Sequence, residues 1–479
     1  MARGRWFFCQ ISGRRRIGKT TLITRLLERH AGKKILYVQI PDSDPSGVLK
    51  AVSDALDDFS VPPGDFPRPR ELRQFARLVR SLAESGYLVI LDEFQYFHRK
   101  ALSPFCSFLQ PEVDRLRDAD KATGGLFVLG SIHSEMSAIL EDRRSPLFNR
   151  VTDRLEIQHL DFATLKELWL AHGITDPYHQ LFLWGLFEGI PKFYRDCFEQ
   201  GVLGPSADYR RETLENVFFK GSSPLRGEAD NWFLSEFRGR YESLLKIIAE
   251  NTGCSHKTIM AEYAKIDEAS EEKQIGGYLN ALVNKYQIIE KRLPIFAVKG
   301  ASKKHRYYIS DNFLLSWLGA IDRQVKASKV LPLGDCVATC SRRLETVEGP
   351  AFEKMIRQLV AELSRRNDPD LSITEIVEGY WNRPDKPDRN IEIDQLLVND
   401  SAKTLRVATC KRDPRRALKD LDRFEAHVGA FLTTKEGRRF SGYRLLKTAF
   451  APAFDEGAVR ALAAKGYQAV GLDELMRRL

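Results

Sequence analysis

FFCQISGRRRIGKTTLITRLLERH, residues 7–30 of this 479-residue sequence, contains the pattern from which the fold of the first domain is predicted. Residues 7–11 are mostly apolar and suit a short strand, and apolar side chains recur at helical spacing from Leu22 onward. The loop between them, residues 13–20, fits the pattern GxxxxGK[ST] at every fixed position. The sequence therefore predicts a strand, a phosphate-binding loop and a helix in direct succession.

The residue types of this loop suit a triphosphate held together with a magnesium ion. Gly13 and Gly18 let the backbone wrap, so that N–H groups and the positive helix N-terminus face the phosphates. Lys19 supplies a charge between the β- and γ-phosphates, and Thr20 supplies a hydroxyl for Mg²⁺. The alternative is a chance glycine turn before a helix. We expect ATP and Mg²⁺ as ligands, with the phosphates surrounded by Gly13, Arg14, Arg15, Arg16, Ile17, Gly18, Lys19, Thr20 and Thr21.

A second strand that ends in two acids completes the predicted nucleotide site. The segment SGYLVILDEFQYF, residues 85–97, carries the unbroken apolar run that is typical of a buried parallel strand. Asp92 follows this run and is predicted to hold Mg²⁺ through water, while Glu93 polarises the attacking water as a general base. A buried strand followed by a solvated acidic turn is the plainer alternative.

Two further strands are predicted at residues 35–40 and 126–129. Ser131 follows the second of them, and groups at the carboxyl ends of parallel strands face the ligand crevice. Ser131 is therefore a candidate catalytic residue that contacts the γ-phosphate or the attacking water. A helix N-cap or a plain turn explains this serine equally well.

Several segments together resemble the archaeal-type ATPase family, in the AAA+/STAND branch of P-loop proteins. They are GRRRIGKTTLI (13–23), LDEFQYF (91–97), LGSIHSEM (129–136), SPLFNR (145–150) and EGIPKFY (188–194). The resemblance implies an ATP-hydrolysing enzyme. It also implies that Arg150, or less favourably Arg154, lies near the γ-phosphate of its own or a neighbouring subunit as an arginine finger or sensor. An ordinary surface arginine is an equal alternative.

The middle of the chain is predicted to hold a helical lid and then a winged helix-turn-helix, made of three helices and a basic hairpin. If the winged helix docks on DNA, its third helix would face the major groove and its hairpin would contact phosphates. A rigid spacer or a dimer contact is the alternative. The residues concerned are Lys273, Gln274, Asn280 and Lys285 on the helix, and Lys303, Lys304, His305 and Arg306 on the hairpin.

The last part of the chain resembles the restriction-endonuclease-like core, with elements in the order αβββαβ. The elements are a helix at 351–366, strands at 373–380, 390–398 and 404–411, a helix at 417–431 and a strand at 443–449. The resemblance implies a Mg²⁺-dependent nuclease site in which Asp394 is the first acid, Lys411 the lysine and Glu353 an accessory acid. Thr409 stands where the second acid is expected, and a neutral hydroxyl is a poor ligand for Mg²⁺. Glu392 shares a strand face with Asp394 and is a further candidate ligand. Two interpretations stay open: a rearranged metal site, or a fold that binds DNA without cutting it.

These observations predict an α/β fold made of several domains. They are a P-loop NTPase core of AAA+ type at 1–159, a helical lid at 160–236, a winged helix-turn-helix at 237–330 and a restriction-endonuclease-like domain at 340–479.

The composition fits a globular protein, because 43% hydrophobic and 29% charged residues exclude collagen-like and broadly disordered chains. No apolar run approaches the ~18 residues of a membrane span, so we expect a cytoplasmic protein with no membrane partner. Lys plus Arg number 74 against 65 Asp plus Glu, a net charge of +9 that permits DNA as a partner without requiring it. We expect an ATPase that acts on or with DNA, with a homo-oligomer left open. The alternatives are a nucleotide-switched signalling or defence assembly protein and a non-cleaving DNA-binding regulator.

Overall fold

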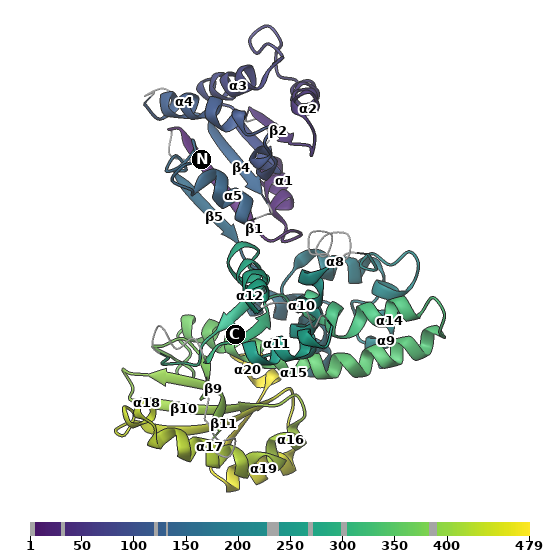
Figure 1. Cartoon of the computed structure of the whole chain (residues 1–479), viewed down its shortest axis with the longest axis vertical. Helices are drawn as coiled ribbons and strands as arrows, with labels where there is room; N and C mark the ends of the chain where they lie inside the picture. The colour runs from purple at the N-terminus through teal and green to yellow at the C-terminus, as the bar shows by residue number, and fades with distance from the viewer. Residues whose placement is uncertain are drawn as a thin grey trace. The chain divides into compact units, whose positions relative to one another are not determined.

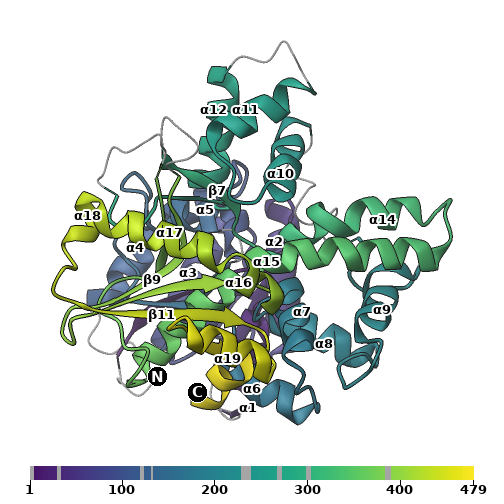
Figure 2. The ribbon, with the colours of Figure 1, turned by 90° about the horizontal axis from the view of Figure 1, so that it is seen from below.

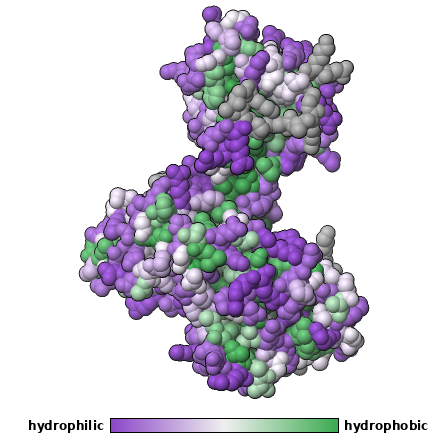
Figure 3. Space-filling model, turned by 180° about the vertical axis from the view of Figure 1, so that it is seen from behind, coloured by the Kyte–Doolittle hydropathy of each residue, from purple (hydrophilic) through white to green (hydrophobic). Residues whose placement is uncertain are grey.

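The structure is a computed structural model, and the chain forms two compact units, Met1–His159 and Leu160–Leu479 (Figure 1). On the face drawn in Figure 3, hydrophilic residues predominate and apolar residues lie in separate patches. Among the described residues, none of the helices has the length and apolarity needed to cross a lipid bilayer. The structure describes residues 5–29, 34–118, 123–130, 133–227, 239–266, 272–297, 304–382 and 390–479.

The first unit is built on a five-stranded parallel sheet with the strand order β2-β3-β4-β1-β5. Strands β3 (Leu88–Asp92) and β4 (Gly125–Gly130) are buried along their whole length, as expected for parallel strands covered on both faces. Because all strands run the same way, their carboxyl ends lie along one edge of the sheet. The remaining strands are β1 (Phe7–Gly13), β2 (Ile35–Gln39) and β5 (Asp153–Ile157).

Alternate side chains of these strands enter two separate cores. Phe8 and Val89 belong to the core that also contains residues of α2, α3 and α4, whereas Ile11 and Ile90 pack in a smaller core with Ile23 of α1. Helices therefore cover both faces of the sheet, which explains the unbroken apolar strand at residues 88–91. The helical elements are α1 (Lys19–Arg29), α2 (Pro45–Asp58), α3 (Leu72–Glu84), the 3₁₀ turn η1 (Phe94–His98), α4 (Pro104–Asp118) and α5 (His133–Leu140).

The second unit is organised around α15 (Leu333–Arg365), which runs for 33 residues. We expected a helix at 351–366; the structure begins it at Leu333 and continues it through Pro350. The carboxylate of Glu362 on α15 accepts hydrogen bonds from the N–H groups of Phe162 and Ala163, at 2.8 and 3.1 Å, and so caps α6. Helix α6 (Phe162–Ala171) thus packs on the same helix that leads into the C-terminal sheet.

Most of the remaining helices of this unit lie between residues 160 and 330. Phe313 stacks between the rings of Phe193 and Phe218, with centroid distances of 4.8 and 6.2 Å. Helix α14 and the first part of α15 form a helical hairpin (Figure 2). The elements are α6 (Phe162–Ala171), α7 (Pro177–Phe187), α8 (Pro191–Glu199), α9 (Tyr209–Leu214), η2 (Glu215–Phe219), α10 (Arg240–Glu250), α11 (His256–Ala264), α12 (Glu272–Asn280), η4 (Ala281–Lys285), α13 (Asn312–Ser316), η6 (Trp317–Ile321) and α14 (Asp322–Ala327).

The predicted hairpin is present as β6 (Ile289–Arg292) and β7 (Arg306–Ile309), paired antiparallel. It does not stand free, because the N–H of Ile295 donates to the carbonyl of Gly379 at 2.9 Å. The Trp381 indole N–H donates to the carbonyl oxygen of Lys304 at 2.8 Å. The hairpin is therefore attached to the C-terminal sheet.

The C-terminal sheet has the strand order β12-β11-β10-β9-β8, antiparallel between β8, β9 and β10 and parallel between β10, β11 and β12. We expected a strand at 373–380 and one helix at 417–431. The strand begins only at Glu378, and two helices, separated at Asp420, stand in place of the single helix. Strand β12 was not expected, because its four residues are too short to show an alternating pattern. The elements are β8 (Glu378–Trp381), β9 (Glu392–Asn399), β10 (Thr404–Cys410), α16 (Pro414–Lys419), α17 (Leu421–Thr433), α18 (Lys435–Arg438), β11 (Arg444–Ala451), α19 (Glu456–Ala464), β12 (Gln468–Gly471) and α20 (Leu472–Arg478).

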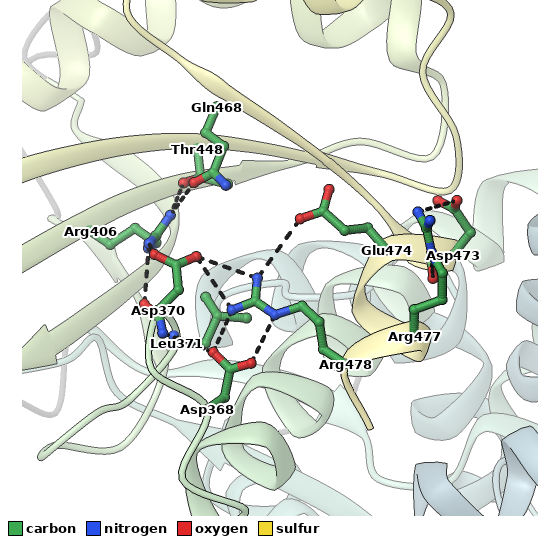
Figure 4. Close-up of polar contacts among 10 residues, drawn as sticks. All are labelled: Asp368, Asp370, Leu371, Arg406, Thr448, Gln468, Asp473, Glu474, Arg477 and Arg478. Carbon is green, nitrogen blue, oxygen red and sulfur yellow. Dashed lines mark hydrogen bonds and ion pairs between the residues drawn. The ribbon is translucent and has the colours of Figure 1, made fainter.

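Charged side chains link the last helix, α20, to this sheet (Figure 4). Arg478 donates through Nε to Asp368 at 2.8 Å and lies 3.4 Å from Asp370. Asp370 also pairs at 2.5 Å with the buried Arg406, which donates in turn to Thr448 at 2.8 Å. Because these groups satisfy one another, a buried arginine is tolerated inside the sheet.

Candidate functional site

The loop before α1 takes a conformation that its glycines make accessible. Gly13 has φ +148°, and a Cβ there would lie 2.7 Å from the carbonyl oxygen of Ile157. Gly18 has φ +99°, where side chains are strained even though nothing lies nearby. Both fixed glycines of the motif are therefore required by the backbone itself.

Lys19 is buried at the start of α1, with 6% of its surface exposed. Its ammonium group donates to the carbonyl oxygens of Gly13 and Arg14, at 2.9 and 3.0 Å. Burial lowers the pKa of Lys19 to about 8, while the charges of Glu93 and Asp92 act in the opposite direction. The side chain therefore remains largely protonated at neutral pH and holds its positive charge at the loop.

Asp92, at the end of β3, is linked directly to the phosphate-binding loop. Its Oδ2 accepts from the Thr20 hydroxyl at 2.9 Å and from the Tyr37 hydroxyl at 2.8 Å, and its Oδ1 accepts from the N–H of Glu93 at 2.8 Å. The structure thus brings together the hydroxyl and the carboxylate that we expected to hold Mg²⁺. A hydroxyl that can bind Mg²⁺ and a carboxylate that can hold a metal-bound water fit the hard-oxygen coordination of this ion, which keeps several waters and phosphate oxygens as ligands.

Tyr37 was not anticipated from the sequence. It lies on β2, whose neighbour in the sheet is β3, and it is paired with Ile90. Burial and the neighbouring Asp92 raise the pKa of its hydroxyl well above the ordinary value, so the hydroxyl acts as a donor. The only feature of the sequence that could have indicated Tyr37 is a hydroxyl-bearing side chain in a mostly apolar strand.

Glu93 follows Asp92 in a left-handed backbone conformation, with φ 55° and ψ 38°. Non-glycine residues in this region store strain and concentrate at functional sites. The side-chain amide of Gln95 donates a hydrogen bond to Oε2 of Glu93. The predicted general base is thus held by Gln95, which lies in the LDEFQYF segment but was not itself predicted as a site residue.

The predicted arginine finger is engaged within its own unit. Arg150 makes a two-point ion pair with Asp114 of α4, with Nε–Oδ1 and Nη2–Oδ2 distances of 2.8 Å. Arg154 on β5 pairs with Glu141 at 2.7 Å. Ser131 lies outside the described residues.

The geometry at the sheet edge is that of a phosphate-binding loop facing an acid pair. Residues 8–131 match the AAA domain family. The five-stranded parallel sheet is typical of P-loop ATPases of the AAA+ class. The AAA domain therefore contains the loop, Tyr37, both acids and Gln95.

Similar proteins were found for longer parts of the chain. Over 433 residues, 88% of this chain and 88% of the relative, it is 26% identical to the uncharacterised protein MJECL04 of Methanocaldococcus jannaschii. A Walker-type ATPase of Pyrococcus abyssi is similar over 65% of this chain and 90% of its own, at 17% identity and a TM-score of 0.48. The ORC2 protein of Aeropyrum pernix, solved with ADPNP and ADP, is similar over 72% and 89%, at 15% identity and a TM-score of 0.44.

A second candidate site lies in the C-terminal sheet, in a pocket of about 260 Å³. Oδ2 of Asp394 accepts from the Thr409 hydroxyl at 3.0 Å, the Cys410 N–H at 2.8 Å and the Lys411 ammonium at 2.8 Å. One carboxylate oxygen thus accepts three hydrogen bonds, two from residues of β10 and one from Lys411, which follows that strand. The pocket is lined by Glu353, Glu392, Asp394, Thr409, Lys411, Ala417, Asp420, Arg423, Phe424 and His427.

The acids around Asp394 do not converge as a metal centre. Burial, reinforced by the charge of Asp394, raises the pKa of Glu353 far above the ordinary value for a carboxyl group. Glu392 is paired with Arg306 at 2.7 Å. Over the part of the chain that the structure describes, no group of three or more His, Cys, Asp or Glu residues is arranged to hold a metal ion.

Asp420, Arg423 and His427 line this pocket and were not predicted. Nδ1 of His427 lies 2.9 Å from the backbone oxygen of Glu392 and 3.1 Å from its nitrogen. These residues belong to or adjoin α17, and no motif links that helix to β9. The sequence offered only their helical spacing as a signal.

The structure corrects the expected role of Arg306 on the hairpin. Its guanidinium pairs with Glu392 and lies 4.7 Å from the centre of the Trp381 ring, so it is used in packing rather than held out for phosphate. On the third helix, Gln274 is exposed and accepts from Arg240 at 2.8 Å. Asn280 and Lys285 are exposed, whereas the side chain of Lys273 and all of Lys303 lie outside the described residues.

Proposed function

We propose that this protein binds and hydrolyses ATP with Mg²⁺ in its AAA domain and acts on or with DNA through its second unit. The observation that carries the first part is the convergence of Lys19, Thr20, Asp92 and Glu93 at one edge of the parallel sheet. A cation for phosphate, two oxygens for a metal ion and a second carboxylate for water are the groups that phosphoryl transfer to water needs.

Each group has a defined part in this proposal. Lys19 binds the β- and γ-phosphates, Thr20 and Asp92 hold the metal ion, and Glu93 accepts the proton of the attacking water. Magnesium, when bound, neutralises charge on the phosphates. Ser131 would contact the γ-phosphate, and Arg150 would serve as finger or sensor after exchanging its ion pair with Asp114 for the nucleotide.

Within the second unit we assign a helical lid to residues 160–236, a winged helix to 237–330 and a restriction-endonuclease-like domain to 340–479. Three helices followed by an antiparallel hairpin support the winged helix. A five-stranded mixed sheet that carries Asp394 and Thr409, with Lys411 directly after β10, supports the nuclease-like assignment.

The DNA-binding part rests on four exposed cations on α16 and α17, which we call the basic rim. Arg415, Arg416, Lys419 and Arg423 are exposed, and none of them has an ion-pair partner among the described residues. By contrast, Lys411 and Arg412 of the same basic run are paired with Asp394 and Glu348. Because Arg423 also lines the pocket of Asp394, the rim borders that pocket and offers unpaired charge to phosphates.

The double variant Arg415→Ala/Arg416→Ala should bind duplex DNA about tenfold more weakly at moderate salt. The slope of log affinity against log salt should shrink by ~0.9 for each phosphate that the variant no longer neutralises. Fluorescence anisotropy over a salt series measures both quantities.

The matched control for this experiment is Arg460→Ala/Arg477→Ala, which removes two exposed arginines from other helices of the same unit. An equal loss in the control, or an unchanged salt slope in the rim variant, would contradict the proposed surface. ATP turnover of the full chain should also rise when DNA is added. Assembly on ATP without any response to DNA would instead favour a nucleotide-switched assembly protein.

We further propose that the C-terminal pocket is a degenerate nuclease site. The support is that Thr409, Cys410 and Lys411 all donate to Asp394, so this carboxylate is satisfied without a metal ion. Metal-dependent cleavage assays on the wild type, Asp394→Ala and Lys411→Ala test this directly. Robust cleavage by the wild type that both substitutions abolish would show an active, rearranged site.

The variant Thr409→Asp should gain affinity for Mn²⁺. A second carboxylate would face Asp394, and two like charges at this separation repel until a cation lies between them. A rise in melting temperature on adding millimolar Mn²⁺ is expected for Thr409→Asp alone. Thr409→Asn, which adds a side chain of the same shape without charge, is the control, and an equal response from both would refute the expectation.

A further inference from the structure

Gln95 is buried in the AAA domain, with 2% of its surface exposed, and its side chain lies against the carboxylate of Glu93. An ionised carboxylate can only accept hydrogen bonds, so the amide nitrogen of Gln95 must be the atom that faces Glu93. This requirement fixes the orientation of the amide and turns its oxygen, Oε1, away from the acid.

The oxygen that is turned away has no hydrogen-bond partner among the described residues, although it is fully buried. It lies at the end of β4, where a Cβ on Gly130 would be 2.9 Å from it. A buried carbonyl without a donor destabilises a protein, and such groups are rare. An apolar side chain at position 95 would leave no carbonyl oxygen unpaired, so the presence of an amide is explained by the hydrogen bond that its nitrogen donates to Glu93.

The amide nitrogen holds a carboxylate whose backbone is itself strained. Glu93 has φ 55°, and the bond from Gln95 joins two residues of the same short turn, at the point where β3 passes into η1. The bond engages one carboxylate oxygen and limits the rotation of the group. The Gln95 side chain lies between Glu93 and Gly130, and this confinement leaves it little freedom to move.

We propose that Gln95 is a positioning residue that orients Glu93 for proton transfer from the attacking water. This inference rests on the proposed function, since it assigns Glu93 as the general base. Gln95 itself touches neither the nucleotide nor the water. Its removal should therefore change the rate of the chemical step and leave ATP binding intact.

The test is Gln95→Met, which keeps the length of the side chain and removes the donor. We expect kcat for ATP to fall about tenfold to a hundredfold, as for a misplaced catalytic group, while the Kd for ATP stays within twofold. Gln10→Met is the matched control, because Gln10 is an equally buried glutamine on β1 with an unpartnered oxygen of its own. Its kcat should stay within twofold of the wild type. Gln95→Glu, which is isosteric and cannot donate when ionised, serves as the second variant if Gln95→Met does not fold.

A double-mutant cycle separates positioning from a merely structural role. In a Glu93→Ala background, Gln95→Met should lower the residual turnover by less than twofold, because the group it orients is gone. The same fold-loss in both backgrounds, or a loss of ATP affinity that matches the loss of kcat, would overturn the inference and leave the proposed function standing. Unchanged turnover in Glu93→Ala would overturn both.

Discussion

ATP turnover should fall by about 10²- to 10⁴-fold in Glu93→Gln, while ATP remains bound to the protein. The substitution keeps the size of the side chain and its place after Asp92, but it removes the carboxylate that accepts the proton of water. Lys19→Ala should abolish turnover and also weaken binding, because the ammonium group is the positive charge held at the loop. Phosphate release measures turnover, and filter retention of labelled ATP measures binding.

Two exposed residues of the same unit provide matched controls for these variants. The control variants are Glu84→Gln and Lys50→Ala. Glu84 lies at the end of α3 and Lys50 on α2; both are exposed to solvent and neither belongs to the phosphate-binding loop. Each should leave turnover within twofold of the wild type. Undiminished turnover in both Glu93→Gln and Lys19→Ala would refute hydrolysis at this site.

Glu348→Ala should lower the free energy of unfolding of the second unit by about 3–5 kcal/mol. Glu348 lies on α15 with 3% of its surface exposed, and its carboxylate accepts from Arg210 at 2.6 Å and from Arg412 at 2.5 Å. Removing it leaves two half-buried guanidinium groups without their shared partner. Urea unfolding of the full chain, followed by tryptophan fluorescence, gives the change.

Glu345→Ala is the comparison for this measurement, because Glu345 is exposed and lies 3.6 Å from the same Arg412. Exposed ion pairs contribute about 0.2–1 kcal/mol, so its effect should stay in that range. Similar losses in the two variants would show that burial does not strengthen this network. Because Arg412 follows Lys411 in the sequence, Glu348→Ala also tests how firmly the C-terminal pocket is held to α9 and α15.

The sequence predicted the loop and the acid pair of the proposed nucleotide site from segments in which neighbours along the chain impose the geometry. Gly13 and Gly18 are required by backbone angles of their own loop, and Lys19 and Thr20 follow them directly. Asp92 could be paired with the loop in advance, because it ends an apolar strand and parallel strands finish at one edge of the sheet.

The sequence was less informative where a side chain finds its partner across the fold. Arg150 was expected near a γ-phosphate and is paired with Asp114, which lies on α4. Arg306 was expected on phosphate and is packed on Trp381. Neither partner is marked by spacing or motif, since an arginine on a basic segment is compatible with any nearby acid.

The loop, the acid pair and the alternation of strands and helices around them can therefore be inferred from the sequence alone, because backbone conformation and hydrophobic periodicity act over a few neighbouring residues. The tertiary structure was needed to show that Tyr37 donates to Asp92, that the hairpin is attached to the C-terminal sheet, and that Thr409 and Lys411 both donate to Asp394. These hydrogen bonds depend on strand order and register, which bring together residues that are distant in the chain and leave no local pattern in either segment.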